Sequence, residues 1–524
     1  MGDQPERPTS SRSEPATGRP LQTDSRPTRS FFGSLEGRLE RLRARASSYR
    51  KHAPRVRKIL EWAVLIVAIC RLIGVRWTPV VTNDSLGYLR RASSPLSTGF
   101  VAEGYRQLAY PVWLWCIDRI SNLFGIDRLF AIVLCQRLLL LVALVLAWRV
   151  LRLWATPALW FVTSTNIVFW TNFVLNESIL LSLGILVAVA VIAGATSQVP
   201  LRSVPVSRHP ERWLVAAIVV VMFATALKLQ YVLLGLPVVA LFFVLAQHRQ
   251  VNVRRVLAVG VGVGVLLSIM VVGQVVENSR EYDEATPLAE QQYAHWWGAY
   301  YSVFTLTPFD RVPESALEFR KDFNYYPQLR GIEPDPHKRK KIVEERIDRL
   351  FRAAGTTRRA QQGLSFFGGL AGGRHADLAN LRNRVGAGQD PVAQNWLGSA
   401  SGAAAVLEQV NDSHETVDWS PPSVVTATQW PLRDSKWVYS LLAVGALAGC
   451  MYGLTLRGRE RWIGPASVLA TVGVAALLST GYIDIQRYLL PYVLSNLFTA
   501  SWIFGRSMGT DGDQLRPSGA TPHG

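Results

Sequence analysis

The stretch LFAIVLCQRLLLLVALVLAWRVL, residues 129–151, decides the fold class. Its 23 residues carry one charge, Arg137, before Arg149 near the end. A bilayer core of about 30 Å takes roughly 20 residues of helix, so this stretch is long and apolar enough to span a membrane. Of the 524 residues, 49% are apolar and 18% charged, which excludes collagen, a coiled coil and a largely disordered chain.

Nine further segments have the length and low charge of spans, so we predict an all-α integral membrane protein with about ten transmembrane helices. Arg55, Arg57 and Lys58 precede the first span and place the N-terminus in the cytoplasm, because basic residues stay inside. The third span is rather polar, and the fifth and sixth are short enough to form one broken helix pair. The predicted spans are 59–75, 129–151, 158–174, 177–195, 213–227, 231–247, 256–276, 438–456, 462–480 and 488–504.

These spans divide the chain into a membrane core in two parts, with a cytoplasmic tail at each end. Both tails are predicted to be disordered, and the first includes a juxtamembrane helix. The first tail has 14 Lys and Arg against 6 Asp and Glu. The tails are residues 1–58 and 506–524, and the core parts are 59–276, with an outer loop at 76–128, and 438–505.

One large hydrophilic block, residues 277–437, separates the seventh span from the eighth. It has 19 Lys and Arg against 21 Asp and Glu, so both its charge and the span count place it outside the cell. Within it, 336–353 is predicted to be a helix and 355–405 a loop or a mobile lid.

The net charge of +18 lies mostly in the predicted inner segments. It therefore indicates orientation in the membrane, and we predict no nucleic-acid partner. The 4 cysteines have neither CxxC nor metal-ligand spacing.

Five charged residues lie at the predicted outer face, where ionisable groups are costly and each is a functional candidate. Asp84 has the alternative of a turn-forming Asn-Asp pair, and Arg106 and Lys228 have the alternative of snorkelling to the headgroups. Glu177 has the alternative of a first-turn acid that suits the helix dipole. Arg487 lies outside against the positive-inside bias, and a guanidinium can grip a phosphate with two hydrogen bonds.

Two further charges have open roles. Arg137 lies about 12 Å from the outer end of its span, at 1.5 Å per residue, and we expect it to contact either a ligand or a structural partner such as Glu177. Asp484 either orients Arg487 or is its surface partner. Because the inner halves of the spans carry almost no ionisable groups, the pattern fits a lipid phosphate that meets a polar acceptor at the outer face.

Four short elements occur in a characteristic order: the acid Asp84 with Tyr88, Arg-x-x-x-Tyr-Pro at 106–111, Asn-Glu-Ser at 176–178 and Arg-Tyr-Leu-Leu-Pro at 487–491. From about residue 59 to 504 the chain resembles the GT-C glycosyltransferases that use polyprenyl-phosphate sugars. These include bacterial relatives of protein mannosyltransferases, of lipid A aminoarabinose transferases and of actinobacterial arabinofuranosyltransferases.

The resemblance implies a GT-C-like fold and sugar transfer from a polyprenyl-phosphate donor to a glycan, lipid or protein acceptor. The reaction would take place on the extracytoplasmic face of a bacterial inner membrane. It implies that Asp84 is the general base and that Arg487 binds the donor phosphate, assisted by Lys228 and Arg106. A divalent metal is compatible with it, and no other cofactor is predicted. The supporting residues are Glu177, Tyr88, Arg137 and Asp484.

The aromatic run YAHWWGAYY supplies His295, Trp296 and Trp297 as candidates for stacking on sugars, with anchoring at the membrane interface as the alternative. Two other function classes stay open. A transporter or flippase of a lipid-linked or anionic substrate would have inverted repeats and broken polar helices near the midplane. A non-catalytic envelope assembly protein would tolerate loss of Asp84 and Arg487.

Overall fold

The protein is described by a computed structural model, and the chain divides into two units, Met1–Leu60 and Glu61–Gly524. Residues 55–60 of the first unit are helical. All contacts given below lie within the second unit. The predicted juxtamembrane helix, Arg106, Asp484 and residues 372–435 lie outside the described residues. The structure describes residues 55–75, 77, 79, 81, 83–93, 107–196, 209–248, 251–286, 291–304, 313–371, 436–456, 458–479 and 485–510.

The described chain is helical, with no strand among those residues. Six of its helices are long and apolar enough to cross a membrane, judged by length and composition. The fold is therefore that of an all-α, multi-pass membrane protein, as predicted, while the count of ten spans stays a prediction. The six segments are Arg128–Val162, Asn176–Thr196, Pro210–Leu227, Leu229–Gln247, Val253–Arg280 and Arg459–Ser479.

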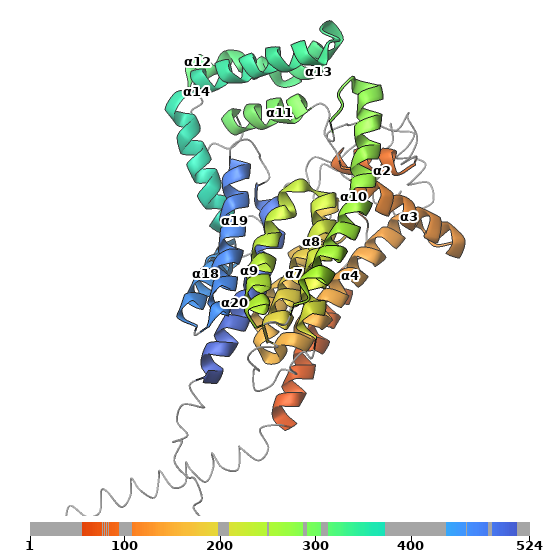
Figure 1. The fold of residues 1–524 in the computed structure, drawn as a ribbon. Coiled ribbons are helices and arrows are strands. Elements are labelled where there is room, and N and C mark those ends of the chain that lie inside the picture. Colours follow the sequence, from red (N-terminus) through yellow and green to blue (C-terminus); the bar gives the residue numbers. More distant parts are fainter. Residues whose placement is uncertain are drawn as a thin grey trace, which may run out of the picture. The chain divides into compact units, whose positions relative to one another are not determined.

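The helices of the membrane bundle pack around α7 (Asn176–Thr196), which lies in the middle of the bundle in Figure 1 and is buried along nearly its whole length. α10 (Val253–Tyr282) is instead exposed along most of its apolar surface, as expected for a helix that faces lipid. The helices that contact α7 are α4 (Arg128–Leu151), α8 (Pro210–Leu227), α9 (Gly235–Gln247) and α20 (Ile485–Thr510). α18 (Lys436–Tyr452) and α19 (Ile463–Ser479) contact α20.

The predicted third span, 158–174, is not one helix. It consists of α5 (Thr156–Val162) and α6 (Thr165–Trp170), separated at Thr163 and Ser164. Each piece is far shorter than the roughly 20 residues that a span requires. The broken segment still runs back along α4, because Asn172, just after α6, accepts a hydrogen bond from Arg137 of α4 at 2.8 Å.

The predicted start of the loop or lid at 355 and that of the C-terminal tail at 506 are also wrong. The helix α14 (Pro336–Ala371) bends at Gly355, where φ is 55° and ψ −135°, and continues to Ala371. Part of the predicted lid is therefore helical, and Phe366 and Leu370 pack against the core of the bundle. α20 runs to Thr510, so the first residues of the predicted C-terminal tail are helical as well.

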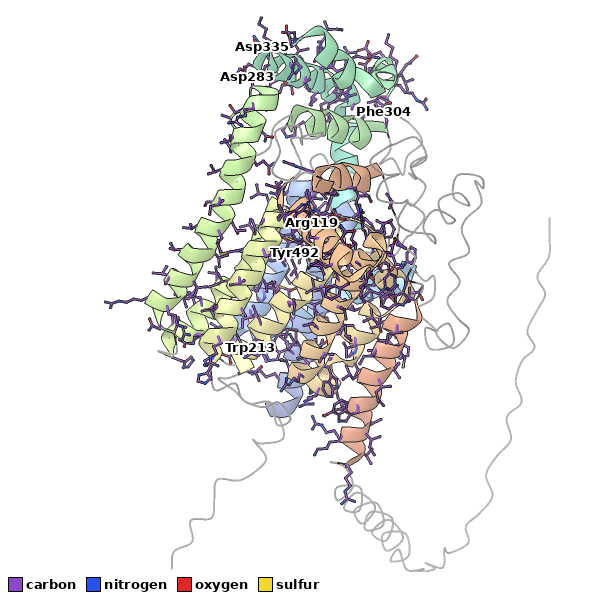
Figure 2. All side chains as sticks on the ribbon, turned by 90° about the vertical axis from the view of Figure 1, so that its right-hand side faces the viewer. Arg119, Trp213, Asp283, Phe304, Asp335 and Tyr492 are labelled. Atoms are coloured by element: carbon purple, nitrogen blue, oxygen red, sulfur yellow. The ribbon has the colours of Figure 1, made fainter. Side chains whose placement is uncertain are left out.

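The helices between α10 and α18 form a subdomain with its own apolar core, which includes Trp296, Phe319, Val343 and Leu350. We call it the α11–α14 subdomain. In Figure 2, Asp283 and Asp335 lie at one end of the second unit and Trp213, near the start of α8, toward the other. The subdomain comprises α11 (Gln291–Phe304), α12 (Glu314–Leu317), η3 (Glu318–Asn324), α13 (Tyr325–Ile332) and α14.

Close contact between α7 and α20 depends on Gly184, where an added Cβ atom would overlap the carbonyl oxygen of Pro491. We predict that Gly184→Ala lowers the free energy of unfolding by about 1–3 kcal/mol, as overpacking of a filled core does. Thermal unfolding of the detergent-solubilised protein measures this. The matched control is Gly262→Ala on α10, where nothing lies within 4 Å of the added atom. Equal melting temperatures for the two variants would contradict the prediction.

Candidate active site

A buried ion pair joins the start of α7 to the end of α8. Glu177 lies in the first turn of α7, where the helix dipole favours a negative charge. Lys228 follows α8 in an extended conformation, with φ −165° and ψ 119°. Its Nζ atom lies 2.9 Å from Oε1 of Glu177; the Glu177 side chain is 1% exposed and that of Lys228 is 21% exposed. The pair thus has a closed carboxylate side and a partly open ammonium side.

The ring of Tyr488, in the first turn of α20, lies under the same ammonium group. Nζ of Lys228 is 3.5 Å from the ring centroid, close enough for a cation–π interaction. Glu177 and Tyr488 therefore hold Lys228 from two helices. The ends of α7, α8 and α20 meet at this point, which we call the site end of the bundle.

Two tyrosines fasten α20 to η2 (Leu229–Leu234), the short helix after Lys228. The hydroxyl of Tyr231 donates to the carbonyl oxygen of Tyr488 at 3.0 Å, and that of Tyr492 donates to the carbonyl oxygen of Gln230 at 2.7 Å. Their rings stack with centroids 5.5 Å apart. These reciprocal bonds fix the first turn of α20 relative to Lys228.

Tyr88 and Tyr110 connect the first loop to α4. Tyr88, in α2 (Asn83–Ser93), meets Tyr110, in α3 (Ala109–Phe124), edge to face at 4.9 Å. The Tyr110 hydroxyl accepts a hydrogen bond from Gln136 Nε2 at 3.2 Å. Burial raises the pKa of Tyr110 well above its usual value, with smaller contributions from Tyr88 and Glu177. The phenol is therefore neutral near pH 7.

Asp84 and Arg487 are placed here by their backbones alone, since their side chains lie outside the described part of the structure. Asp84 precedes Tyr88 by four residues in α2, so the two share one helix face. Arg487 directly precedes Tyr488 in α20. Tyr88 and Tyr488 are the neighbours of these two residues whose side chains the structure describes.

Arg137 makes structural contacts. Its guanidinium donates to the carbonyl oxygens of Leu72 and Val75, at 3.1 and 2.8 Å. It also lies 4.2 Å from the ring of Trp77. Leu72 and Val75 end the first helical segment of the second unit, where carbonyl groups have no partner within the helix. Arg137 supplies that partner, along with the bond to Asn172.

The predicted sugar-stacking aromatics lie in the α11–α14 subdomain. Trp296 is 0% exposed and packs on Tyr325 with ring centroids 5.0 Å apart. Its ring therefore belongs to the subdomain core, and neither sugar stacking nor interfacial anchoring fits it. His295 is exposed, and Trp297 lies in α11 with a side chain outside the described atoms.

The Glu177–Lys228 pair and the Tyr231–Tyr492 pair were not predicted from sequence. Glu177 and Lys228 are 51 residues apart in the chain, and the two tyrosine hydrogen bonds join residues that are 257 and 262 apart. No local pattern joins such distant partners. The one sequence signal was the position of a charge at each end of a predicted span. Among the described residues, no group of three or more His, Cys, Asp or Glu side chains could hold a metal ion.

Comparisons with known proteins add one structural likeness. No family model matches the chain, and no curated protein matches it. The chain is similar to the crystal structure of ArnT from Cupriavidus metallidurans bound to undecaprenyl phosphate. The match has 16% sequence identity, covers 89% of this chain and 81% of that chain, and has a TM-score of 0.31. A likeness at this identity and TM-score does not establish the function of this chain.

We predict that Arg137→Leu destabilises the protein, because it leaves two buried carbonyl groups unpaired at about 1–3 kcal/mol each. Thermal unfolding of the purified variant measures the loss. Ligand binding per folded molecule should stay at the level of the unsubstituted protein, since the described contacts of Arg137 are structural. Full stability together with lost ligand binding would instead place Arg137 at the ligand.

Proposed function

We propose that the chain is an integral membrane glycosyltransferase that moves a sugar from a polyprenyl-phosphate donor to a glycan, lipid or protein of the cell envelope. The reaction takes place on the extracytoplasmic face of a bacterial inner membrane. The observation that carries the proposal is the partly exposed Lys228, held by Glu177 and Tyr488 at the site end. ArnT, to which this chain is similar, was crystallised with undecaprenyl phosphate, and the proposal assigns the same ligand class here.

The two cations bind the phosphate of the donor. A lysine ammonium has three N–H donors; Glu177 takes one, and the 21% exposure of Lys228 leaves room for a ligand oxygen. In the transfer, the bond between the anomeric carbon and the phosphate oxygen breaks and its electron pair stays on the phosphate. Fixed cations stabilise this growing charge more than they stabilise the donor. Arg106 is assigned to the same phosphate.

Asp84 acts as the general base. The acceptor hydroxyl loses its proton to the carboxylate as its oxygen bonds to the anomeric carbon, a role that contributes about 10²–10⁴-fold to the rate. α2 carries Asp84 four residues before Tyr88, whose ring contacts Tyr110 edge to face. Asp484 is assigned to orient Arg487.

A transporter or flippase remains the second candidate, because the break between α5 and α6 is a discontinuous helix of the kind that transporters use. One experiment separates the two. Proteoliposomes receive a radiolabelled polyprenyl-phosphate sugar and envelope acceptors; the proposal expects the label in a new glycosidic product. Accumulation of unchanged donor in the opposite leaflet would favour the flippase.

We predict that Asp84→Asn lowers the turnover number by about 10²-fold or more, because an amide does not accept the acceptor proton. Donor affinity should change little. The radiolabel assay measures turnover, and binding of undecaprenyl phosphate measures affinity. The matched control is Asp118→Asn on α3, an acid paired with Arg128 at 3.0 Å. Full turnover by Asp84→Asn would remove this residue from the role of base.

We predict that Arg487→Ala weakens undecaprenyl phosphate binding by about tenfold or more, the loss that 1.4 kcal/mol represents. A lost guanidinium–phosphate contact is the physical reason. Arg487→Lys should recover part of the affinity, because it keeps the charge and loses the planar fork. An unchanged dependence of rate on donor concentration would reject the assignment.

A further inference from the structure

The Glu177–Lys228 pair presents a difficulty for a site that binds phosphate. Glu177 neutralises Lys228 at 2.9 Å while remaining 1% exposed. Its carboxylate therefore repels a phosphate that approaches Lys228. A phosphate on the open side of Lys228 would share the ammonium with the buried carboxylate. Two anions around one cation repel each other strongly when little water screens them. The carboxylate must therefore lower the affinity of the site for phosphate.

The chemistry of the proposed reaction makes that lower affinity useful. The donor is a phosphate diester with a single negative charge. The product, polyprenyl phosphate, is a monoester with a second pKa near 6, so at pH 7 it carries about −1.5 to −2. Lys228 and Arg487 would hold the product more tightly than the donor. A nearby fixed carboxylate repels the product more than the donor, because the repulsion scales with the charge of the ligand.

We propose that Glu177 is a built-in counter-ion that competes with phosphate for Lys228 and so keeps the polyprenyl phosphate product releasable. The inference rests on the proposed function. Glu177 acts through Lys228 and is a positioning residue, since its carboxylate is buried behind the ammonium. Tyr488 completes the arrangement, because its ring limits the ammonium from a second side at 3.5 Å and directs the remaining N–H toward the exposed side.

The competing explanation is that the pair merely stabilises the fold. Removing one partner of a buried pair is destabilising, and a damaged site binds its ligand less well. If Glu177 is a competing counter-ion, its removal should raise the affinity for phosphate. No buried carboxylate would then offset the charge of Lys228. A gain in affinity is thus a readout that structural damage does not produce.

The chain offers a matched control at Glu460, in η7 (Arg459–Trp462). Glu460 is hydrogen-bonded to Arg506 of α20, and both side chains are buried, at 6% and 7% exposure. The two pairs join residues at similar separations in the chain, 46 residues for Glu460 and Arg506 and 51 residues for Glu177 and Lys228. Glu460→Gln therefore removes a buried carboxylate from an arginine and leaves Lys228 untouched.

The experiment uses the full chain in lipid nanodiscs, with undecaprenyl phosphate as the probe and undecaprenol as the control for the lipid tail. Equilibrium binding gives the affinity, and chase with unlabelled probe gives the dissociation rate. We expect Glu177→Gln to bind undecaprenyl phosphate about tenfold more tightly, the change that 1.4 kcal/mol represents, and to release it correspondingly more slowly. Glu460→Gln should bind like the unsubstituted protein, and undecaprenol binding should not change.

Glu177→Asp serves as the second variant in case Glu177→Gln does not fold. Its carboxylate is one methylene farther from Lys228 and keeps the charge, so we expect an intermediate gain of about threefold, or half the free-energy change. No binding of undecaprenyl phosphate by the unsubstituted protein would overturn the proposed function. Binding by that protein, with equal or weaker binding in the Glu177 variants, would overturn this inference alone.

Discussion

A bilayer core offers no hydrogen-bond partners, so polar groups inside the bundle have to be paired within the protein. Several long-range bonds in the second unit follow from this constraint. Arg137 donates hydrogen bonds to carbonyl oxygens at the end of the first helical segment. The side chain of Asn496 in α20 donates to Thr471 of α19 at 2.7 Å, and the hydroxyls of Tyr231 and Tyr492 bind carbonyl groups across η2 and α20. Each bond also fixes the relative height of two helices.

The same constraint explains which parts of the fold could be predicted from sequence. Uninterrupted apolar runs such as α4 and α7 were recognised because a helix pairs its own backbone and needs only an apolar surface. The break at Thr163 and Ser164 was missed. There the Thr163 hydroxyl donates to the Leu159 carbonyl oxygen at 2.8 Å, and such side-chain bonds let a helix end inside a hydrophobic stretch. The continuation of α14 past Gly355 was missed because the stretch after it is rich in Gly and Ala, and glycine is common where helices end.

Sequence analysis selected individual candidate residues and did not predict the contacts between them. Charges at the ends of predicted spans selected Glu177 and Lys228 separately, because each is costly near a bilayer. No sequence pattern pairs them, since the contact depends on how α7, α8 and α20 pack. Lys228 was assigned to the phosphate and Glu177 to a support role; the ion pair shows that neither can be considered without the other. Burial of Trp296 in a second core was likewise a property of tertiary packing.

Two buried ion pairs in one chain illustrate how surroundings determine what a pair does. The side chains of Glu460 and Arg506 are both buried, so neither charge is open to a ligand and the pair has a structural role. Glu177 and Lys228 are unequal: the anion is enclosed, while the cation remains one-fifth exposed and rests on an aromatic ring. An enclosed anion behind an exposed cation leaves a weakened positive charge facing outward. That is the electrostatic property suited to a ligand that must bind as a monoanion and leave with more negative charge.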